Sequence, residues 1–362
     1  MLLFYINSIL MFYPKICFRK QEKVKENNLK ESSIFKDMEN DVNSSNLDEH
    51  TKKKIFVNIL NLKNKKVNLM ITGATGCGKS STINAMFNTD IAKVGIGVDP
   101  ETMDIKKYEL NNLILWDSPG LGDGKEKDIQ HSKGIISKLN ELDDNDQPLI
   151  DLALIILDGG SRDLGTSYEL INSVIIPNLG ENAKDRVLIA INQADVAMKG
   201  RYWDFEKNKP ESKLIDFLEE KVKSVKNRVK EATGINIEPI YYSAGFKEEG
   251  EAQRPYNLSK LLYFIVKNTP TEKRLAYVNT TSDDEEMWED SDELKDYTAE
   301  IQKSFIETIV ETSQAGGEIG EELGEIFGMG KTGEAIGKVA GAVVGAAKSV
   351  ISSTWNALTS WW

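Results

Sequence analysis

GATGCGKS, the stretch from Gly73 to Ser80, decides the fold because it follows the apolar run VNLMI and precedes STINAMF. Glycines let a backbone curl around an anion, and the unpaired N–H groups at a helix start donate hydrogen bonds to it. The Lys79 ammonium can then reach the outer phosphates of a nucleotide, and the Ser80 hydroxyl can bind Mg²⁺. The strand before the loop and the helix after it favour this interpretation over a glycine turn without a ligand.

This loop is expected to hold the phosphates with a continuous run of residues. The run consists of Gly73, Ala74, Thr75, Gly76, Cys77, Gly78, Lys79, Ser80 and Ser81. Cys77 could in addition be a redox-sensitive thiol, if the helix start lowers its pKa. The alternative is that this position tolerates many residue types.

The motif WDSPG follows the loop in the chain and closes a short apolar run. Asp117 stands where a carboxylate could hold Mg²⁺ through water, and Gly120 stands where a backbone N–H could meet the γ-phosphate. An aspartate that begins a turn after a strand is common, so the motif gains weight only from its position after the phosphate loop.

Two further motifs, INQAD and YYSAG, close later apolar runs. The Asp195 carboxylate can accept hydrogen bonds from both N1–H and N2–H₂ of guanine, a pair of donors that adenine does not offer. Asn192 would either brace the loop or contact the base edge. The backbone of Ser243 and Ala244 could meet the guanine O6, and ligands bind at such strand ends in open α/β sheets.

Short apolar runs alternate with helical periodicity from Val67 to about Pro270, which predicts strand–helix units around a parallel sheet. The predicted strands are VNLMIT, MDIKKYEL, LILWD, DLALIILD, RVLIAIN and IEPIYYS. Most are apolar throughout, as expected for strands with helices on both faces. DIKKYEL alternates polar and apolar residues and precedes the turn-forming pair Asn111-Asn112, so it is predicted to be an antiparallel edge strand.

The order GATGCGKS, DSPG, NQAD and SA resembles that of Era-like P-loop GTPases, and most closely the bacterial 50S ribosome-binding GTPases, including the YfjP- and YeeP-like prophage GTPases. The resemblance covers about residues 55–270. It implies a G domain that binds GTP or GDP with Mg²⁺ and hydrolyses GTP as a molecular switch. It also implies that Thr102 senses the γ-phosphate and Mg²⁺, with Thr89 as a weaker candidate and a plain strand-entry residue as the alternative.

Two residues depart from the usual pattern of these GTPases. Gln193 replaces the lysine whose stem could lie over the base, which predicts weaker guanine affinity. Leu121 stands where many GTPases carry a glutamine that orients water, which predicts slow unassisted hydrolysis. Arg162 could stabilise charge in the same chain, although a solvated loop arginine is the plainer interpretation.

The composition limits the compartment and the partners. The net charge of −12 disfavours nucleic-acid phosphates as partners unless a local basic patch exists. Two cysteines give no disulfide framework and two histidines argue against a histidine metal site, so a reducing cytoplasmic location is expected. The apolar start is too short to span a bilayer and lacks the flanks of a signal peptide, and Met11 or Met38 could be the true initiator.

The C-terminal third reads differently from the G domain. SDDEEMWEDSDE packs eight acids into twelve residues and predicts a solvated linker, with an acidic docking site as the alternative. Glycines then recur at every fourth position in two series, at Gly316, Gly320, Gly324, Gly328 and at Gly333, Gly337, Gly341, Gly345. Such spacing favours close helix approach, so a helical hairpin turning near Gly330–Gly333 is expected.

The predicted organisation is a flexible or helical extension over 1–54, a G domain over 55–270, an acidic linker over 271–300 and a glycine-rich helical tail over 301–362. The tail could pack on itself, associate with a second copy, contact the inner face of the membrane, or be a flexible extension. A nucleotide-controlled assembly or membrane-associated protein with little hydrolysis is therefore the alternative to a GTPase switch. The ribosome or RNA enters as a partner through the family resemblance alone.

Overall fold

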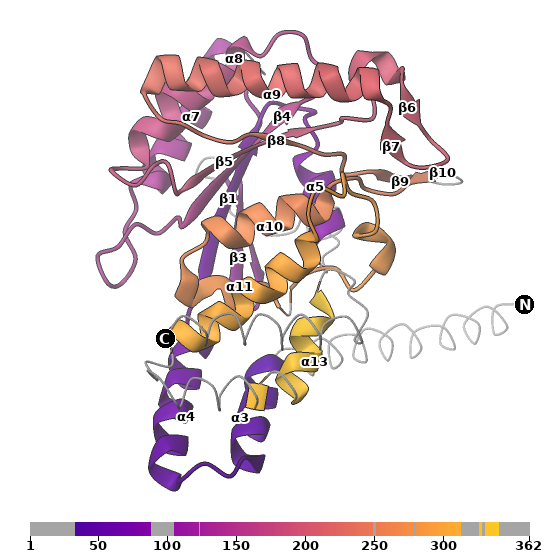
Figure 1. Ribbon diagram of the computed structural model, residues 1–362. Helices are drawn as coiled ribbons and strands as arrows, with labels where there is room; N and C mark the ends of the chain where they lie inside the picture. The colour runs from indigo at the N-terminus through magenta and orange to yellow at the C-terminus, as the bar shows by residue number, and fades with distance from the viewer. Residues whose placement is uncertain are drawn as a thin grey trace, which may run out of the picture.

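The computed structural model describes residues 33–87, 105–122, 124–248, 251–278, 280–312, 326–327 and 330–339. Its main sheet has six strands in the order β2-β3-β1-β4-β5-β8 (Figure 1). They are β1 (Val67–Gly73), β2 (Lys106–Leu110), β3 (Leu113–Asp117), β4 (Leu152–Asp158), β5 (Val187–Asn192) and β8 (Ile240–Tyr241). Only β2 pairs antiparallel in this sheet, so the mostly parallel sheet and its antiparallel edge strand are confirmed.

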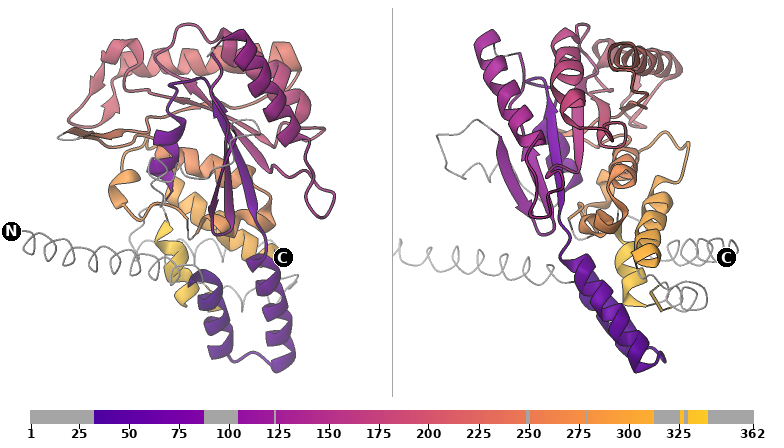
Figure 2. Two further views of the ribbon diagram at one scale, coloured as in Figure 1. Left: turned by 180° about the vertical axis from the view of Figure 1, so that it is seen from behind. Right: turned by 90° about the vertical axis from the view of Figure 1, so that its left-hand side faces the viewer.

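Helices cover both faces of this sheet (Figure 2). The α-helices are α3 (Ser33–Ser44), α4 (Glu49–Lys63), α5 (Lys79–Met86), α7 (Lys125–Leu139), α8 (Gly165–Glu169), α9 (Ser212–Thr233), α10 (Leu258–Asn268), α11 (Tyr297–Thr312) and α13 (Lys331–Gly337). A π-helix, Leu170–Ile175, continues α8, and 3₁₀ turns lie at Ile176–Asn178, Ala197–Gly200, Thr271–Tyr277 and Glu285–Met287. Two small ribbons, β6 (Trp203–Asp204) with β7 (Lys209–Pro210) and β9 (Phe246–Glu248) with β10 (Glu251–Gln253), were not predicted.

The apolar strands divide their side chains between two cores. Leu69 and Ile71 of β1 belong to the core with α4, α5, α10 and α11, whereas Met70 belongs to the core with α7 and α9. Alternate residues of a strand point to opposite faces, so a strand that is buried on both faces must be apolar throughout. The same alternation in β4 and β5 holds the loops at the carboxyl ends of the strands on a rigid platform.

The acidic run after α10 is less solvated than its composition predicts. Trp288 is only 5% exposed, and Asp292 pairs with Lys260 of α10 at 2.6 Å. Arg254 forms ion pairs with Glu289 and Asp290 in the same way. The prediction of a solvated linker is wrong for this part of the run, because a buried tryptophan and three paired acids fix it to the G domain. The exact domain boundaries stay a prediction.

A helical C-terminal region is present, as predicted. α11 packs against α10, and α13 packs against α3 near the opposite end of the chain (Figure 1). The Asp41 carboxylate of α3 accepts hydrogen bonds from the backbone N–H groups of Lys331 and Thr332 at 3.1 and 2.9 Å. A Cβ at Gly330 would lie 2.4 Å from this carboxylate, so a larger residue there would require the Asp41 side chain to shift.

The expected glycine hairpin can be followed only in small part. Most glycines of the two series, together with the terminal tryptophans, lie outside the described residues. Gly330 precedes the start of α13, and Gly333 lies buried within it. Within the described ranges, no helix is both long enough and apolar enough to cross a membrane.

Candidate functional site

The loop between β1 and α5 is shaped by glycines that no other residue can replace without a shift. A Cβ at Gly73 would lie 2.2 Å from the carbonyl oxygen of Ile156 in β4. Gly78 begins α5 with a left-handed φ of 87°, and a Cβ there would lie 2.2 Å from Nδ2 of Asn192. The loop therefore sits tightly against β4 and the end of β5, with its backbone at the start of a helix.

The charged and hydroxyl groups predicted for phosphate and metal lie on this loop. Nζ of Lys79 donates to the carbonyl oxygens of Gly73 and Ala74, each at 3.2 Å, so the ammonium lies over the loop. Ser80 and Ser81 lie exposed in the first turn of α5. An ammonium, a hydroxyl and free helix-start N–H groups together form a cradle for an anion and its counter-cation.

Asp117 ends β3 with an unusual carboxylate. Its Oδ1 is buried and has no hydrogen-bond partner among the described residues. Burial raises the pKa of Asp117 above its ordinary value, while the positive charges of Lys79 and, to a smaller extent, Lys106 oppose that rise. A buried, unpaired carboxylate oxygen is costly unless a cation satisfies it, so this group fits the Mg²⁺ role predicted from the sequence.

The DSPG loop lies directly against the phosphate loop. A Cβ at Gly120 would lie 2.4 Å from both the backbone N and Oγ1 of Thr75, so only glycine allows this approach. The backbone N–H of Thr75 donates to the carbonyl oxygen of Leu121 at 3.2 Å. The structure therefore brings Gly120 to the phosphate loop, while a contact of its N–H with the γ-phosphate stays a prediction.

Asn192 joins three of the four predicted motifs. Its Nδ2 donates to the carbonyl oxygen of Cys77 at 2.9 Å, and its Oδ1 accepts from the backbone N–H of Ala244 at 2.9 Å. Of the two roles left open for Asn192, the structure shows bracing. Its amide holds the phosphate loop, the end of β5 and the SAG loop in fixed relation.

The remaining residues of the predicted base site lie beside this brace. Nε2 of Gln193 donates to the carbonyl oxygen of Gly76 at 3.0 Å, so the residue that replaces the usual lysine contacts the phosphate loop. Asp195 is 7% exposed, and Ser243 is 2% exposed with its Oγ accepting from the N–H of Gly245 at 3.3 Å. The Ser243 side chain is therefore turned inward. Its backbone N–H donates to the carbonyl oxygen of Tyr256 at 3.0 Å, and its carbonyl oxygen accepts from the Tyr256 N–H at 2.9 Å. The Ala244 N–H donates to Asn192, so the backbone N–H groups predicted to meet the guanine O6 already have partners within the protein.

Four predictions from the sequence, for Cys77, Leu121, Arg162 and Thr102, have different outcomes here. Burial raises the pKa of the Cys77 thiol, which is 1% exposed, so the redox-sensitive thiolate is wrong. Leu121 is 5% exposed and its side chain packs into the core with α7. Arg162 is exposed, while Thr102 and its competitor Thr89 lie outside the described residues.

Sequence reasoning missed two contacts that support the site. The hydroxyls of Thr82 in α5 and Tyr242 after β8 lie 2.7 Å apart, and both side chains are buried. Nζ of Lys221 in α9 donates to three carbonyl oxygens of the loop after β4, those of Asp158, Gly159 and Ser161. The sequence carries no signal for either pair, because the partners lie about 60 or more residues apart.

Comparison with known proteins agrees with this arrangement. Residues 68–193 match the family model described as 50S ribosome-binding GTPase. This region is similar to P-loop GTPase domains. The curated relatives include two uncharacterised proteins of Escherichia coli K12. YkfA is 28% identical over 157 residues, which cover 42% of this chain and 50% of YkfA, and YfjP is 29% identical over 131 residues, which cover 35% and 41%.

The GTPase domain thus matches half or less of the length of these relatives. Among solved structures, Toc33 from Arabidopsis thaliana in complex with Mg²⁺ and GMPPNP is 14% identical, covers 65% of this chain and 97% of Toc33, and has a TM-score of 0.36.

Proposed function

We propose that this protein binds GTP and GDP with Mg²⁺, hydrolyses GTP to GDP and phosphate, and acts as a molecular switch. The observation that carries the proposal is the position of Asn192, which is bonded at once to the phosphate loop and to the SAG loop. A cradle for phosphates and a loop for a base are useful together only if one ligand spans both. A nucleoside phosphate is such a ligand.

The roles of the site residues follow from their chemistry. The backbone N–H groups of the phosphate loop and Lys79 would balance the phosphate charge, while Ser80 and Asp117 would hold Mg²⁺. Bound Mg²⁺ supplies further positive charge to the phosphate that is transferred. Because Leu121 packs in the core, no side chain at that position orients water, and unassisted turnover of roughly 10⁻⁴ to 10⁻² s⁻¹ is expected.

Calorimetry of the wild type with GDP, GTP and ATP in the presence of Mg²⁺ tests the nucleotide assignment. Guanine nucleotides should bind and ATP should bind far more weakly, because Asp195 would be left unpaired by adenine. Asp195→Asn turns an acceptor into a donor, so affinity should move from GDP to xanthosine diphosphate, whose base carries a carbonyl at that position. Asp185→Asn, an exposed change at the amino ends of the strands, is the matched control. Equal binding of ATP and GTP to the wild type would contradict the proposal.

Hydrolysis is tested separately, by phosphate release in single turnover. Release that depends on Mg²⁺ and is absent from Lys79→Ala supports a GTPase. Tight binding without measurable release, together with nucleotide-dependent assembly, would favour the assembly protein instead. The family description names the 50S subunit, so a ribosomal partner is also proposed, and co-sedimentation with 50S subunits in GTP and GDP tests it.

A further inference from the structure

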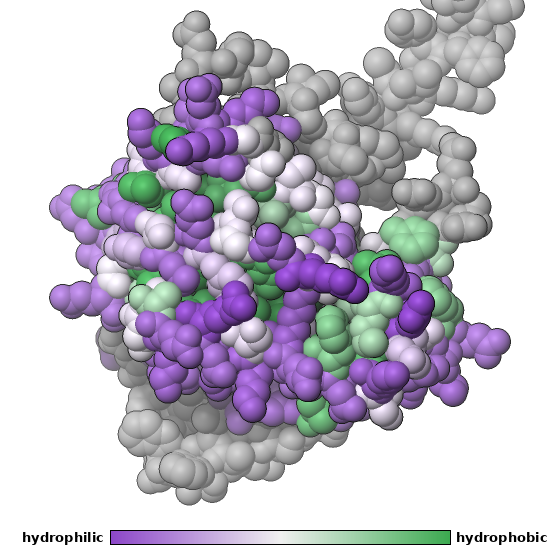
Figure 3. Space-filling model, turned by 90° about the horizontal axis from the view of Figure 1, so that it is seen from above, coloured by the Kyte–Doolittle hydropathy of each residue, from purple (hydrophilic) through white to green (hydrophobic). Residues whose placement is uncertain are grey.

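A second groove lies beside the nucleotide cradle, between the loop after β4 and α9. It is a cavity of about 930 Å³ that shares no residue with the phosphate loop or with Asn192 and Asp195. Its basic lining residues are Arg162, Lys199, Arg201, Lys221 and Arg228, against the two acids Asp163 and Glu220. Seen from the side of α9, hydrophilic side chains cover most of this face of the molecule (Figure 3).

The cations at the rim of this groove are not used by the fold. Arg162, Lys199 and Arg201 are exposed or half-buried, and no ion pair or hydrogen bond joins their side chains to another of the described residues. Oδ1 of Asp163, one of the two acids, already accepts from the backbone N–H of Gly165 at 2.8 Å. The groove therefore concentrates positive charge on a protein whose net charge is −12.

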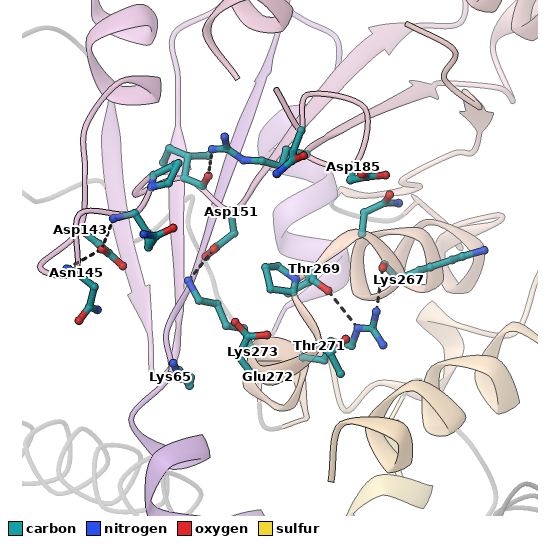
Figure 4. A pocket seen from close by; sticks show the side chains of 18 residues that line it. Lys65, Asp143, Asn145, Asp151, Asp185, Lys267, Thr269, Thr271, Glu272 and Lys273 are labelled. Atoms are coloured by element: carbon teal, nitrogen blue, oxygen red, sulfur yellow. Dashed lines mark hydrogen bonds and ion pairs between the residues drawn. The ribbon is translucent and has the colours of Figure 1, made fainter. Parts of the chain in front are cut away.

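Another cavity, of similar size, has cations that are already paired within the protein. It lies at the amino ends of the strands, measures about 830 Å³ and also has five basic lining residues, but with four acids (Figure 4). There, Lys273 pairs with Asp151 at 2.6 Å, and the Arg186 guanidinium donates to the carbonyl oxygens of Leu179 and Ile150. Those cations hold the fold together, whereas the cations at the rim of the α9 groove remain available to a ligand.

The α9 groove also offers aromatic faces. The Arg228 guanidinium lies 5.0 Å from the centre of the Tyr168 ring, and Phe217 is 36% exposed at the same groove. Arginine forks bind phosphate oxygens in pairs, and exposed rings stack on bases. We infer that the α9 groove binds a chain of closely spaced phosphate groups, and that its occupation acts on the nucleotide site. The phosphates can come from inorganic polyphosphate or from the backbone of a single-stranded RNA.

A short series of hydrogen bonds links the groove to the nucleotide cradle. Nζ of Lys221 donates to the carbonyl oxygens of Gly159 at 2.6 Å and Ser161 at 2.7 Å, which fixes the loop that carries Arg162. The backbone N–H of Gly159 donates to the carbonyl oxygen of Asn192 at 2.7 Å, and a Cβ at Gly159 would lie 2.5 Å from that oxygen. A ligand that moves this loop would therefore act directly on the backbone of Asn192, the brace of the cradle.

Binding is measured first, with full-length protein, excess Mg²⁺ and saturating GDP so that the nucleotide site is filled. Tripolyphosphate is followed by calorimetry and a fluorescent single-stranded RNA by anisotropy. Lys199→Glu/Arg201→Glu should weaken binding by about tenfold or more and lower its dependence on salt. Lys53→Glu/Lys54→Glu, with the same charge change on exposed residues of α4, should bind like the wild type. Failure of the wild type to bind either probe, or an equal loss in both variants, would overturn the proposal.

The two sources are separated by a third variant. Phe217→Ala should weaken RNA binding and leave tripolyphosphate binding unchanged if bases stack in the groove. An unchanged affinity for both probes assigns the groove to phosphate alone, which still supports the proposal.

The coupling between the α9 groove and the nucleotide site rests on the proposed function, and it is measured through the affinity for GDP. Saturating tripolyphosphate should change the Kd for GDP by about fivefold in the wild type but not in Lys199→Glu/Arg201→Glu, and GDP should change the affinity of the groove by the same factor. An equal change in both proteins would be competition at the phosphate loop and would overturn the coupling. Lys221→Met should reduce that factor while thermal unfolding confirms the fold. A constant GDP affinity would overturn the coupling. A protein that binds tripolyphosphate in the groove but no GDP at all would refute the proposed function and leave the groove assignment standing.

Discussion

Two aspartates at opposite ends of the same sheet, the half-buried Asp117 and the buried Asp151, have opposite surroundings. Asp151 precedes β4 at the amino ends of the strands, where its carboxylate accepts from Lys273 at 2.6 Å and from the backbone N–H of Asn68 at 2.8 Å. Asp117 ends β3 at the carboxyl ends, and its Oδ1 has no partner among the described residues. Burial raises the pKa of both groups, so burial alone does not distinguish them.

Satisfaction of the carboxylate is what distinguishes structure from function in this sheet. A paired and hydrogen-bonded aspartate such as Asp151 belongs to the fold, because removal of its partner leaves a buried charge. An unsatisfied one such as Asp117 costs stability unless a ligand completes it, and sites of this kind cluster where ligands bind. The comparison predicts that changes at the carboxyl ends alter ligand binding, and that changes at the amino ends alter stability.

Lys79→Ala should give the largest effect at the carboxyl ends. Loss of the ammonium removes two charge-assisted contacts to phosphate, each worth about 1.5–3 kcal/mol, so GDP and GTP binding should fall below detection. Thermal unfolding without nucleotide should stay close to that of the wild type, because among the described residues the Lys79 side chain bonds only to carbonyls of its own loop. Retained turnover in this variant would contradict the site.

Lys273→Met tests the amino ends. It leaves Asp151 buried without its cation, so the free energy of unfolding should fall by about 3–5 kcal/mol. Asp151→Asn/Lys273→Met removes both charges and should recover much of that loss. Chemical denaturation measures both variants, and GDP affinity of the folded fraction should be unchanged. A single variant as stable as the wild type would show that the ion pair contributes nothing to the fold.

The site residues at the carboxyl ends of the strands could be predicted from the sequence. The ion pair at the amino ends could not. GATGCGKS, DSPG, NQAD and SAG are local motifs whose glycines and polar residues report a loop directly. The Asp151–Lys273 pair joins residues 122 positions apart, and Lys273 lies in a stretch whose composition predicted a linker. The bracing by Asn192 was one of two roles left open, because only the fold shows which atoms its amide meets. The inward packing of Leu121 was hidden for the same reason.

Leu121→Gln tests the packing of Leu121 in the core. Its expected effect on the free energy of unfolding is smaller than that of Lys273→Met. If Leu121 packs in the core, the glutamine amide is buried without partners, and the free energy of unfolding should fall by about 1–3 kcal/mol. GTP turnover should not rise. Chemical denaturation and phosphate release measure the two effects. Faster turnover at unchanged stability would show that this position faces the nucleotide.

Asp117→Asn should give the smallest change in the free energy of unfolding. The direction of that change follows directly from the raised pKa of Asp117. Because burial raises the pKa of Asp117, the folded protein binds more protons than the unfolded chain between the ordinary aspartate pKa and the raised value. Stability from this group therefore increases as pH falls through that window, and the penalty is complete above it. Without Mg²⁺ and nucleotide at neutral pH, Asp117→Asn should be as stable as the wild type or more stable by up to about 1 kcal/mol.

That difference should shrink as the pH is lowered below the raised pKa of Asp117, because the wild-type carboxylate then becomes protonated and neutral like the amide. Mg²⁺ with GDP should raise the thermal midpoint of the wild type more than that of Asp117→Asn, because only the carboxylate gains from the cation. Asp185→Asn, an exposed change at the amino ends, should show neither effect. If Asp117→Asn instead destabilises the nucleotide-free protein by several kcal/mol, as Lys273→Met is expected to do, then Asp117 is a structural carboxylate like Asp151. The contrast between the carboxyl ends and the amino ends of the strands would then be lost.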